Sequence, residues 1–197
     1  MTKDFNWKHI AKLLLTSRYI DEVEEQELVP QKKVTYQFSA KGHELAQILL
    51  SSLINNKHDG ASVYYRSRPF VLTQGLTIEE ALASSMAKSK SISGGRDIGV
   101  VFNMHSRGKA TILPTSGDVG SQYTPAVGWA QAIQYYQKVL KQKDWNNNEK
   151  KRVIIIFYEH RSSNKIEGTQ SDFKTKLRNV TVGQVMNIYL FFSYVVS

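Results

Sequence analysis

The sequence contains no cysteine. Disulfide frameworks, structural thiolate metal sites and cysteine nucleophiles are therefore excluded, and a chain of 197 residues can build its core without them. The first residues, MTKDFNWKHIAK, are charged and polar, and no apolar stretch of the kind found in secretory signals follows them. The most apolar segment, 185–197, has 13 residues, fewer than the roughly 20 that a helix needs to cross a bilayer. These absences predict a cytoplasmic protein with no membrane segment.

The formal net charge of +9 is concentrated in one part of the chain. Residues 138–178 hold eleven basic and five acidic side chains and supply +6 of that charge, whereas the remainder is nearly balanced. A basic tail on a neutral body attracts polyanions in a salt-sensitive, non-specific way. It lacks the interleaved aromatic side chains that stack on nucleic-acid bases, so no specific nucleic-acid partner is expected.

The spacing of apolar residues predicts alternating helices and β-like runs. A helix over 4–27 is indicated by apolar and then acidic residues along one side, ending with Glu24. Thr77 and Glu80 have the spacing of a capping box, in which each side chain satisfies a backbone amide at a helix start. The other predicted elements are a β-like run at 34–38, a helix after Gly42, a β-like piece at 62–65, a long loop at 88–110 and a helix with Thr124 at its N-cap and Pro125 in its first turn.

The run 153–157 is apolar throughout and has the length of a strand. That pattern is typical of a strand buried on both faces in a parallel sheet. Together with the preceding helices it favours an α/β architecture. After residue 158 no sustained period is visible, and the apolar end 185–197 is predicted to be an unpaired, aggregation-prone strand.

Three stretches, in order, carry a resemblance to a known family: YQFSAKGHELAQ; ASVYYRSRPF; and GGRDIGVVFNMHS followed by PTSGDVGSQYTPAVGWAQAI. Over residues 5–157 they resemble the α subunit, or the α-like half of a fused chain, of thiamine-diphosphate-dependent 2-oxo acid dehydrogenases of the pyruvate and branched-chain (2-oxoisovalerate) types. The third stretch looks closest to the branched-chain type with fused halves. The resemblance implies an α/β fold, namely the N-terminal part of a thiamine-diphosphate-binding fold, helix-rich with an incomplete parallel sheet.

The resemblance also suggests cofactor-binding residues. Tyr65 and Arg66 match the pair that holds the diphosphate, and an arginine fork suits phosphate oxygens; a solvated arginine beside a half-buried tyrosine is the structural alternative. Gly117 and Val119 match the loop that cradles the thiazolium ring, with Val119 packing on the cofactor. His105 matches a histidine near the mouth of the active site, and the alternative is an exposed loop histidine.

The same loop matches a monovalent cation site found in several relatives. By that match Ser116, Ser121 and Gln122 are oxygen ligands, and oxygen donors suit a hard cation. A Ser- and Gly-rich turn before a helix explains the composition nearly as well. The Gly-His-Glu triplet that begins at Gly42 is interpreted as structural, a glycine turn whose polar pair braces the next helix.

The sequence departs from the family after the apolar run. A Gly-Asp-Gly or Gly-Glu-Gly triplet and a later asparagine are expected there, and their oxygens hold the Mg²⁺ that bridges the two phosphates. The chain instead reads YEHRSSN over 158–164, without a glycine turn that lets the backbone approach the diphosphate. Glu159 and Asn164 lack the family context, so no Mg²⁺ site is recognised.

The predicted organisation is an incomplete cofactor-binding region at 1–158 and an unassigned tail at 159–197 that is truncated, frameshifted or diverged. By resemblance, the complete enzyme oxidatively decarboxylates a 2-oxo acid and transfers the acyl unit to a lipoyl group, with a β-type subunit and a lipoyl-bearing acyltransferase component as partners. Diphosphate charge left without Mg²⁺ is costly to bury, so weak cofactor binding and little activity are expected of the isolated chain. The alternatives are a non-catalytic remnant that associates with a β-type subunit and, ranked last, a basic nucleic-acid binder.

Overall fold

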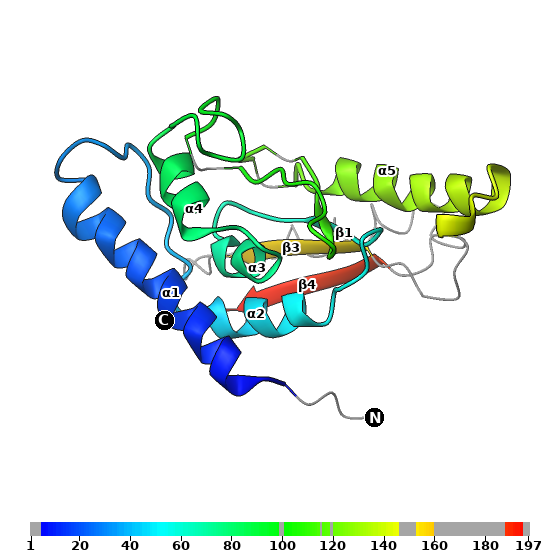
Figure 1. Cartoon of the computed structure of the whole chain (residues 1–197), viewed down its shortest axis with the longest axis horizontal. Helices are drawn as coiled ribbons and strands as arrows, with labels where there is room; N and C mark the ends of the chain where they lie inside the picture. The colour runs from blue at the N-terminus through cyan, green and yellow to red at the C-terminus, as the bar shows by residue number, and fades with distance from the viewer. Residues whose placement is uncertain are drawn as a thin grey trace.

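The computed structural model describes residues 5–98, 101–114, 116–118, 120–145, 153–159 and 188–194, the last two ranges as strands (Figure 1). In chain order the elements are α1 (Trp7–Val23), the π-helical turn η1 (Glu24–Leu28), α2 (Glu44–Ser52), β1 (Gly60–Ser62), α3 (Arg68–Thr73), α4 (Ile78–Ser85), β2 (Thr111–Ile112), α5 (Tyr123–Gln134), the π-helical turn η2 (Tyr135–Val139), the 3-10 turn η3 (Lys143–Trp145), β3 (Val153–Glu159) and β4 (Ile188–Tyr194). None of the helices in these ranges is long and apolar enough to cross a membrane.

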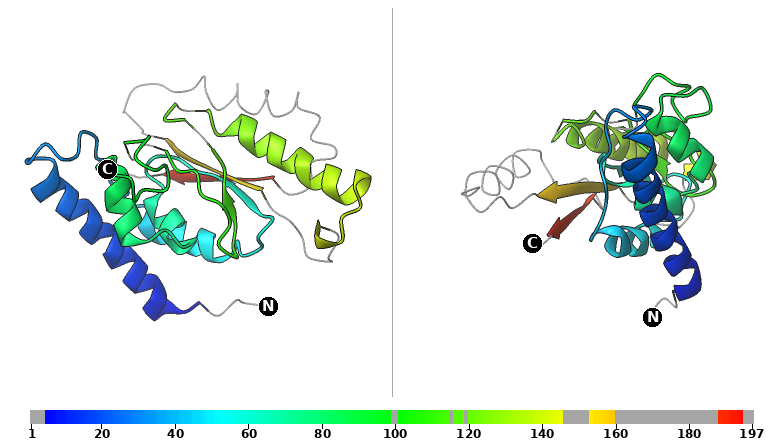
Figure 2. Two further views of the ribbon diagram at one scale, coloured as in Figure 1. Left: turned by 45° about the horizontal axis from the view of Figure 1, so that its top comes forward. Right: turned by 90° about the vertical axis from the view of Figure 1, so that its left-hand side faces the viewer.

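The four strands form one parallel sheet in the order β2-β1-β3-β4. β3 lies between two partners, because Ile155 is opposite Ser62 of β1 and opposite Leu190 of β4. In the right-hand view of Figure 2, α5 lies above the strands and α2 lies below them. The predicted α/β architecture, with a parallel sheet that includes 153–157, is confirmed.

The apolar end of the chain belongs to this sheet. β4 pairs with β3 along its whole length, from Val153 opposite Ile188 to Glu159 opposite Tyr194. The prediction of an unpaired strand in 185–197 is therefore wrong for 188–194. An apolar strand inside a parallel sheet needs a partner at each edge, and no local pattern in the sequence identifies which distant segment supplies it.

The N-terminal helix begins and ends close to the predicted limits. The Asn6 side chain caps α1 by accepting a hydrogen bond from the His9 amide (3.0 Å), and the π-helical turn carries the helix on to Leu28. The run 34–38, predicted to be β-like, is not a strand. A β-like composition forms a strand only beside a pairing partner, and the structure pairs this run with none of its four strands.

The main hydrophobic core lies between the first four helices and the strands β1 and β2. Its centre includes Phe70 and Val71, both fully buried. They belong to α3, a short helix that the sequence prediction missed. Pro69 stands in the first turn of α3, where its missing amide removes no helical hydrogen bond, but a helix of six residues leaves too few periods to detect.

Two helix starts test the predicted caps. The capping box at α4 is formed as predicted: the Glu80 amide donates to Thr77 Oγ1 (3.1 Å) and the Thr77 amide donates to Glu80 Oε2 (2.9 Å). At α5 the predicted cap is wrong, because the helix begins at Tyr123 and Thr124 lies inside it. Gln122 occupies the N-cap position and makes no capping side-chain bond.

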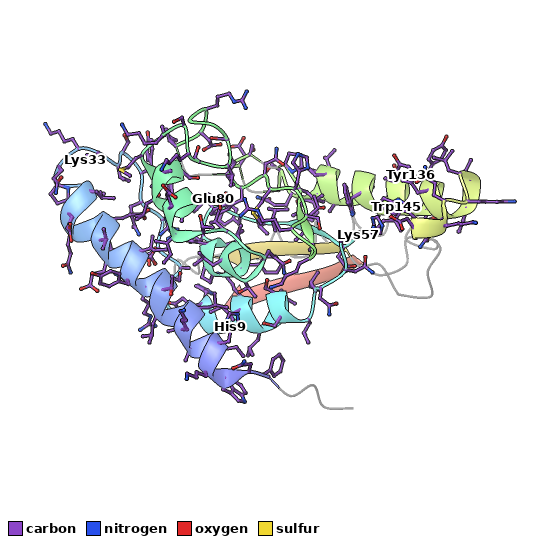
Figure 3. The ribbon with its side chains drawn as sticks, viewed as in Figure 1. His9, Lys33, Lys57, Glu80, Tyr136 and Trp145 are labelled. Carbon is purple, nitrogen blue, oxygen red and sulfur yellow. The ribbon has the colours of Figure 1, made fainter. Side chains whose placement is uncertain are left out.

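A close contact between α5 and β1 depends on a glycine. A Cβ atom built on Gly60 would lie 2.4 Å from Cδ1 of Trp129, so only glycine lets the indole ring cover the start of the strand. Trp129 Nε1 also donates to the His58 carbonyl oxygen (3.0 Å). The ring of Trp145 stacks on His58 (3.8 Å between centroids) and on Tyr136 (4.7 Å). Figure 3 shows Trp145 and Tyr136 together at the end of the α5 region.

Candidate cofactor-binding site

The predicted cofactor residues follow the carboxyl ends of two neighbouring parallel strands. Tyr65 and Arg66 come shortly after β1, and the loop 113–122 follows β2. Two hydrogen bonds join this loop to β1: Leu113 N donates to the Ala61 carbonyl (2.9 Å), and Ser62 Oγ donates to the Gln122 carbonyl (2.7 Å). The residues after β1 and the loop after β2 are therefore brought to one edge of the sheet.

The strand order marks this edge as a ligand-binding position. From β1 the chain passes to β2 on one side and then crosses back to β3 on the other side. In open α/β sheets, ligands bind outside the carboxyl ends of the strands at such a reversal of strand order. Tyr65 and Arg66 leave β1 at this point.

The Arg66 side chain lies against two aromatic rings and donates to one backbone carbonyl. Its guanidinium carbon lies 5.6 Å from the Phe38 ring centroid and 5.5 Å from that of Tyr65, which are cation–π distances. Nη1 donates to the Ser39 carbonyl (2.8 Å), while the Arg66 carbonyl accepts from Gln47 Nε2 (3.1 Å). The side chain is half-buried and oriented, and it is not the freely solvated arginine that the structural alternative describes.

Aromatic side chains around Arg66 form a small cluster. The ring of Tyr65 lies 4.4 Å from Phe38 and 3.8 Å from Tyr64, measured between centroids. Burial raises the pKa of the Tyr64 phenol well above its ordinary value, with a further contribution from its hydrogen bond with Tyr65, so Tyr64 stays neutral. Sequence reasoning named Tyr65 and missed Phe38 and Tyr64, although both lie within the stretches that carry the resemblance.

The loop 116–122 folds on itself through hydrogen bonds between its own groups. Ser121 Oγ donates to the Ser116 carbonyl (3.1 Å), and Ser116 Oγ accepts from the Asp118 amide (3.1 Å). Gly120 takes a positive φ of 93°, and its amide donates to Gln122 Oε1 (3.1 Å). Ser116 and Gly117 are exposed, and Val119 lies outside the described residues.

Gln122 is the most enclosed of the three predicted cation ligands. Its side chain is fully buried, and its Nε2 has no hydrogen-bond partner within the described ranges. A buried amide donor without a partner is uncommon in proteins and calls for a ligand or a water molecule. Ser116 and Ser121 use their oxygens within the loop, as a Ser- and Gly-rich turn does.

His105 makes no hydrogen bond, ion pair or ring contact with Arg66 or with the loop 116–122 among the described residues. It is exposed and follows Met104, which pairs with Ile112 in an antiparallel bridge. Arg107 fastens this hairpin to α4 by donating to both carboxylate oxygens of Glu80 (2.5 and 2.9 Å). The predicted loop 88–110 is therefore anchored near its end.

The Arg107 contact controls the ionisation of Glu80. The hydrogen bond from Arg107, helped by the bonds from Thr77 and opposed by burial, lowers the pKa of Glu80 to about 2. Arg107 Nη1 also donates to the Gly75 carbonyl (2.7 Å). Sequence reasoning found Glu80 as a helix cap but missed its second role, because Arg107 lies 27 residues away.

The triplet at Gly42 braces α2, as interpreted from the sequence. Gly42 has a positive φ of 92° and its amide donates to Glu44 Oε2 (2.8 Å). Glu44 Oε1 accepts from Arg18 Nε of α1 (2.8 Å). The carboxylate thus joins the turn, the start of α2 and α1.

A buried ion cluster lies behind the site and was not predicted. Arg68 Nη1 donates to Asp21 Oδ1 (2.7 Å), and Nη2 donates to both oxygens of Glu24 (2.8 and 2.9 Å). The exposed fractions are 7% for Arg68, 1% for Asp21 and 0% for Glu24. Burial raises the pKa of Asp21, against the opposing effect of Arg68. The sequence does contain a sign of this cluster, because Asp21 and Glu24 lie on the side of the first helix that is apolar in its earlier turns.

The described residues suit one part of a diphosphate ligand. Arg66 supplies a cationic fork after β1 at the reversal of strand order, and Gln122 supplies a buried donor in the loop after β2. No group of three or more His, Asp or Glu side chains within the described ranges could hold a metal ion. Glu159 ends β3 at the same edge of the sheet, and Asn164 lies outside the described residues.

A shallow cleft elsewhere on the surface does not involve these groups. It has a volume of about 550 Å³ and lies between α1 and the start of α4, where Leu15, Tyr19 and Ile78 line it. None of the predicted site residues contributes to it. The cleft therefore gives no support to the cofactor assignment.

Comparison with known proteins gives the identity of the family. A search of curated protein sequences finds no match. The sequence profile of the family described as dehydrogenase E1 component matches residues 11–167, and so extends beyond residue 158. Because this match covers most of the chain and agrees with the parallel α/β architecture, the chain belongs to the dehydrogenase E1 component family, the thiamine-diphosphate-dependent enzymes that decarboxylate 2-oxo acids.

Proposed function

We propose that this chain binds the diphosphate of thiamine diphosphate through Arg66, with Tyr65 beside it, as part of a 2-oxo acid dehydrogenase. The observation that carries the proposal is the oriented, half-buried guanidinium of Arg66 at the reversal of strand order. A fork of donors fixed in this way recognises phosphate oxygens through charge-assisted hydrogen bonds. The cofactor, when bound, supplies the carbon nucleophile for decarboxylation, and the protein supplies position and compensating charge.

The loop after β2 is proposed to hold the other end of the cofactor. Gly117 and Val119 contact the thiazolium ring in this proposal, and Ser116, Ser121 and Gln122 bind a monovalent cation. The buried Nε2 of Gln122, which has no partner in the described part of the chain, is a donor and calls for an acceptor atom of a ligand, whereas a cation would be bound by the side-chain oxygen. In this proposal the Gln122 side-chain oxygen, now bonded to the Gly120 amide, turns toward the cation.

The finer assignments of substrate and partners follow from the resemblance alone. We propose a 2-oxo acid of the pyruvate or branched-chain type as the substrate, a lipoyl group as the acyl acceptor, and His105 as a catalytic residue at the mouth of the site. The partners are a β-type subunit and a lipoyl-bearing acyltransferase component. The exposure of His105 on an anchored hairpin supports a role toward a ligand that arrives from outside.

The second part of the proposal concerns the Mg²⁺-binding residues of the site. The sequence over 158–164 lacks the glycine triplet with a carboxylate, so no residue is recognised that would hold Mg²⁺ beside the diphosphate. We propose that 1–158 forms an incomplete cofactor-binding region, that 159–197 is a truncated, frameshifted or diverged tail, and that the isolated chain binds the cofactor weakly. The runner-up is a non-catalytic protein that associates with a β-type subunit, and the same missing triplet favours it.

Calorimetric titration of the full chain with thiamine diphosphate and Mg²⁺ tests both parts. We expect weak saturation for the unaltered chain and a further loss of about ten-fold or more for Arg66→Gln, since a hydrogen bond to a charged group contributes about 1.5–3 kcal/mol. Arg96→Gln is the matched control, because Arg96 is an exposed arginine that bonds the Ser93 carbonyl. Equal affinities for the chain and Arg66→Gln would refute the diphosphate role, and tight micromolar binding would refute the missing metal side.

Adding a purified β-type subunit separates the enzyme from the runner-up. Decarboxylation of pyruvate or a branched-chain 2-oxo acid by the mixture supports the enzyme. Formation of a complex that stays inactive with every 2-oxo acid tried supports the non-catalytic protein.

A further inference from the structure

Arg66 is connected to the buried ion cluster through the segment before α2. The carbonyl that accepts from Arg66 Nη1 belongs to Ser39. The hydroxyl of Ser39 donates to Asp21 Oδ2 (2.8 Å), and the amide of Ala40 donates to the same oxygen (3.4 Å). One carboxylate of α1 therefore holds the residue whose carbonyl orients Arg66.

Asp21 is itself fixed from the opposite side. Arg68 donates to its other oxygen, Oδ1, and also clamps Glu24, which accepts a short hydrogen bond from the Ser85 hydroxyl. All of these groups are buried. In a low-dielectric interior such charge-assisted bonds are short and directional, so the Asp21 carboxylate has little freedom to rotate.

Asp21 holds the end of the segment 34–40 through side-chain hydrogen bonds. The segment forms neither helix nor strand, so no regular hydrogen-bond pattern holds it. Gln37 Nε2 donates to Asp21 Oδ1 (3.4 Å), which adds a third contact beside those of Ser39 and Ala40. Phe38, whose ring lies against the Arg66 guanidinium, stands between these contacts.

We propose that Asp21 is a positioning residue for Arg66: it fixes Ser39 and Phe38, and these set the direction of the guanidinium. The inference rests on the proposed function, in which Arg66 binds a diphosphate. A fork that is already ordered loses less side-chain freedom when a ligand arrives, which is worth between about two- and ten-fold in affinity. The two arginines of the Arg-Ser-Arg sequence thus have different tasks, Arg68 in the interior and Arg66 toward the ligand.

A pair of serine variants tests the connection. Ser39→Ala removes the hydroxyl that binds Asp21 on the Arg66 side, and Ser85→Ala removes a hydroxyl that binds Glu24 in the same cluster on the opposite side. The full chain is labelled with ¹⁵N-arginine, the Arg66 signal is assigned by its loss in Arg66→Gln, and proton exchange of the guanidinium is measured below the unfolding temperature. We expect exchange at Arg66 to become faster by about five-fold or more in Ser39→Ala and to change little in Ser85→Ala.

Equal exchange rates in the two serine variants would overturn the positioning role, whatever their effect on thermal stability. Binding is followed in the same samples with millimolar thiamine diphosphate and Mg²⁺, and with thiamine, which lacks phosphates. We expect Ser39→Ala to weaken only the diphosphate form. If Arg66 loosens in Ser39→Ala but Arg66→Gln leaves diphosphate binding unchanged, the proposed function fails while the structural connection stands; if Arg66→Gln abolishes binding and Ser39→Ala leaves Arg66 ordered, only the connection fails.

Discussion

Residue 60 shows how a single hydrogen atom in place of a methyl group shapes the contact of a helix with a sheet. Gly60→Ala would place Cβ 2.4 Å from the indole of Trp129, and since the ring is also held by its bond to His58, the contact can relax only by moving α5. We expect a loss of about 1–3 kcal/mol in the free energy of unfolding, measured by chemical denaturation.

Gly128→Ala is the matched control for this prediction. Gly128 lies in α5, and an added Cβ would meet nothing within 4 Å. Alanine in a helix interior is favoured over glycine, so this variant should gain up to about 1 kcal/mol. A destabilised Gly128→Ala, or an unaffected Gly60→Ala, would contradict the packing described for α5.

Glu80 should make folding stability depend on acid pH. Its pKa in the folded chain is about 2, below the ordinary value of 4.5 for the unfolded chain. The folded state therefore binds fewer protons, and the stabilisation is present above about pH 4.5 and is lost as the pH falls toward 2. At neutral pH we expect Glu80→Gln to cost about 1–3 kcal/mol and to flatten the pH profile over that interval.

The neighbouring acid provides the comparison. Glu79 pairs with Lys90 (2.5 Å), but the two side chains are 66% and 73% exposed, and such surface pairs contribute little. Glu79→Gln should leave both the stability at neutral pH and its acid profile nearly unchanged. Similar profiles for the two variants would show that the Arg107 contact does not hold Glu80 in solution.

At the scale of elements, the sequence predicts the helices and strands that are determined by residues close to one another in the chain. The capping box of α4 involves residues three positions apart, and the run 153–157 is apolar throughout and has the length of a strand, so both elements were predicted correctly. The run 34–38 was misassigned because a strand needs a pairing partner, and the structure pairs this run with none of its four strands; Gln37 donates instead to Asp21 of α1. α3 was missed because six residues carry almost no period.

In the candidate site, too, some residues were predicted from the sequence and others were not. The resemblance places Tyr65, Arg66 and the loop 116–122 in one family pattern, and the parallel sheet brings both segments to one edge. The buried cluster behind them stayed hidden, since Arg68 meets Asp21 across 47 residues and Glu24 across 44. Sequence position alone does not reveal such contacts, although acidic residues on an apolar helix face call for a cationic partner.

For the whole molecule, the pairing of β4 with β3 predicts how the chain tolerates shortening. A chain that ends after residue 187 would leave the outer edge of β3 without its partner. An apolar strand with unpaired backbone groups associates with other chains, so we expect this variant to form oligomers in light scattering coupled to size exclusion.

A chain that ends after residue 194 is the control, because it keeps β4 whole. It should behave as the full chain does. If both shortened chains have the same oligomeric state as the full chain, β4 does not protect β3 in solution.

The rings around His58 also give the protein a built-in optical signal. Of its three tryptophans, Trp7 is 61% exposed, whereas Trp129 covers Gly60 and Trp145 stacks on the imidazole of His58. Loosening of the contact between α5 and β1 therefore changes the fluorescence emission of Trp129 and Trp145 and leaves that of Trp7 nearly constant. Fluorescence of the unmodified protein can thus monitor the packing of α5 on β1 without any attached dye.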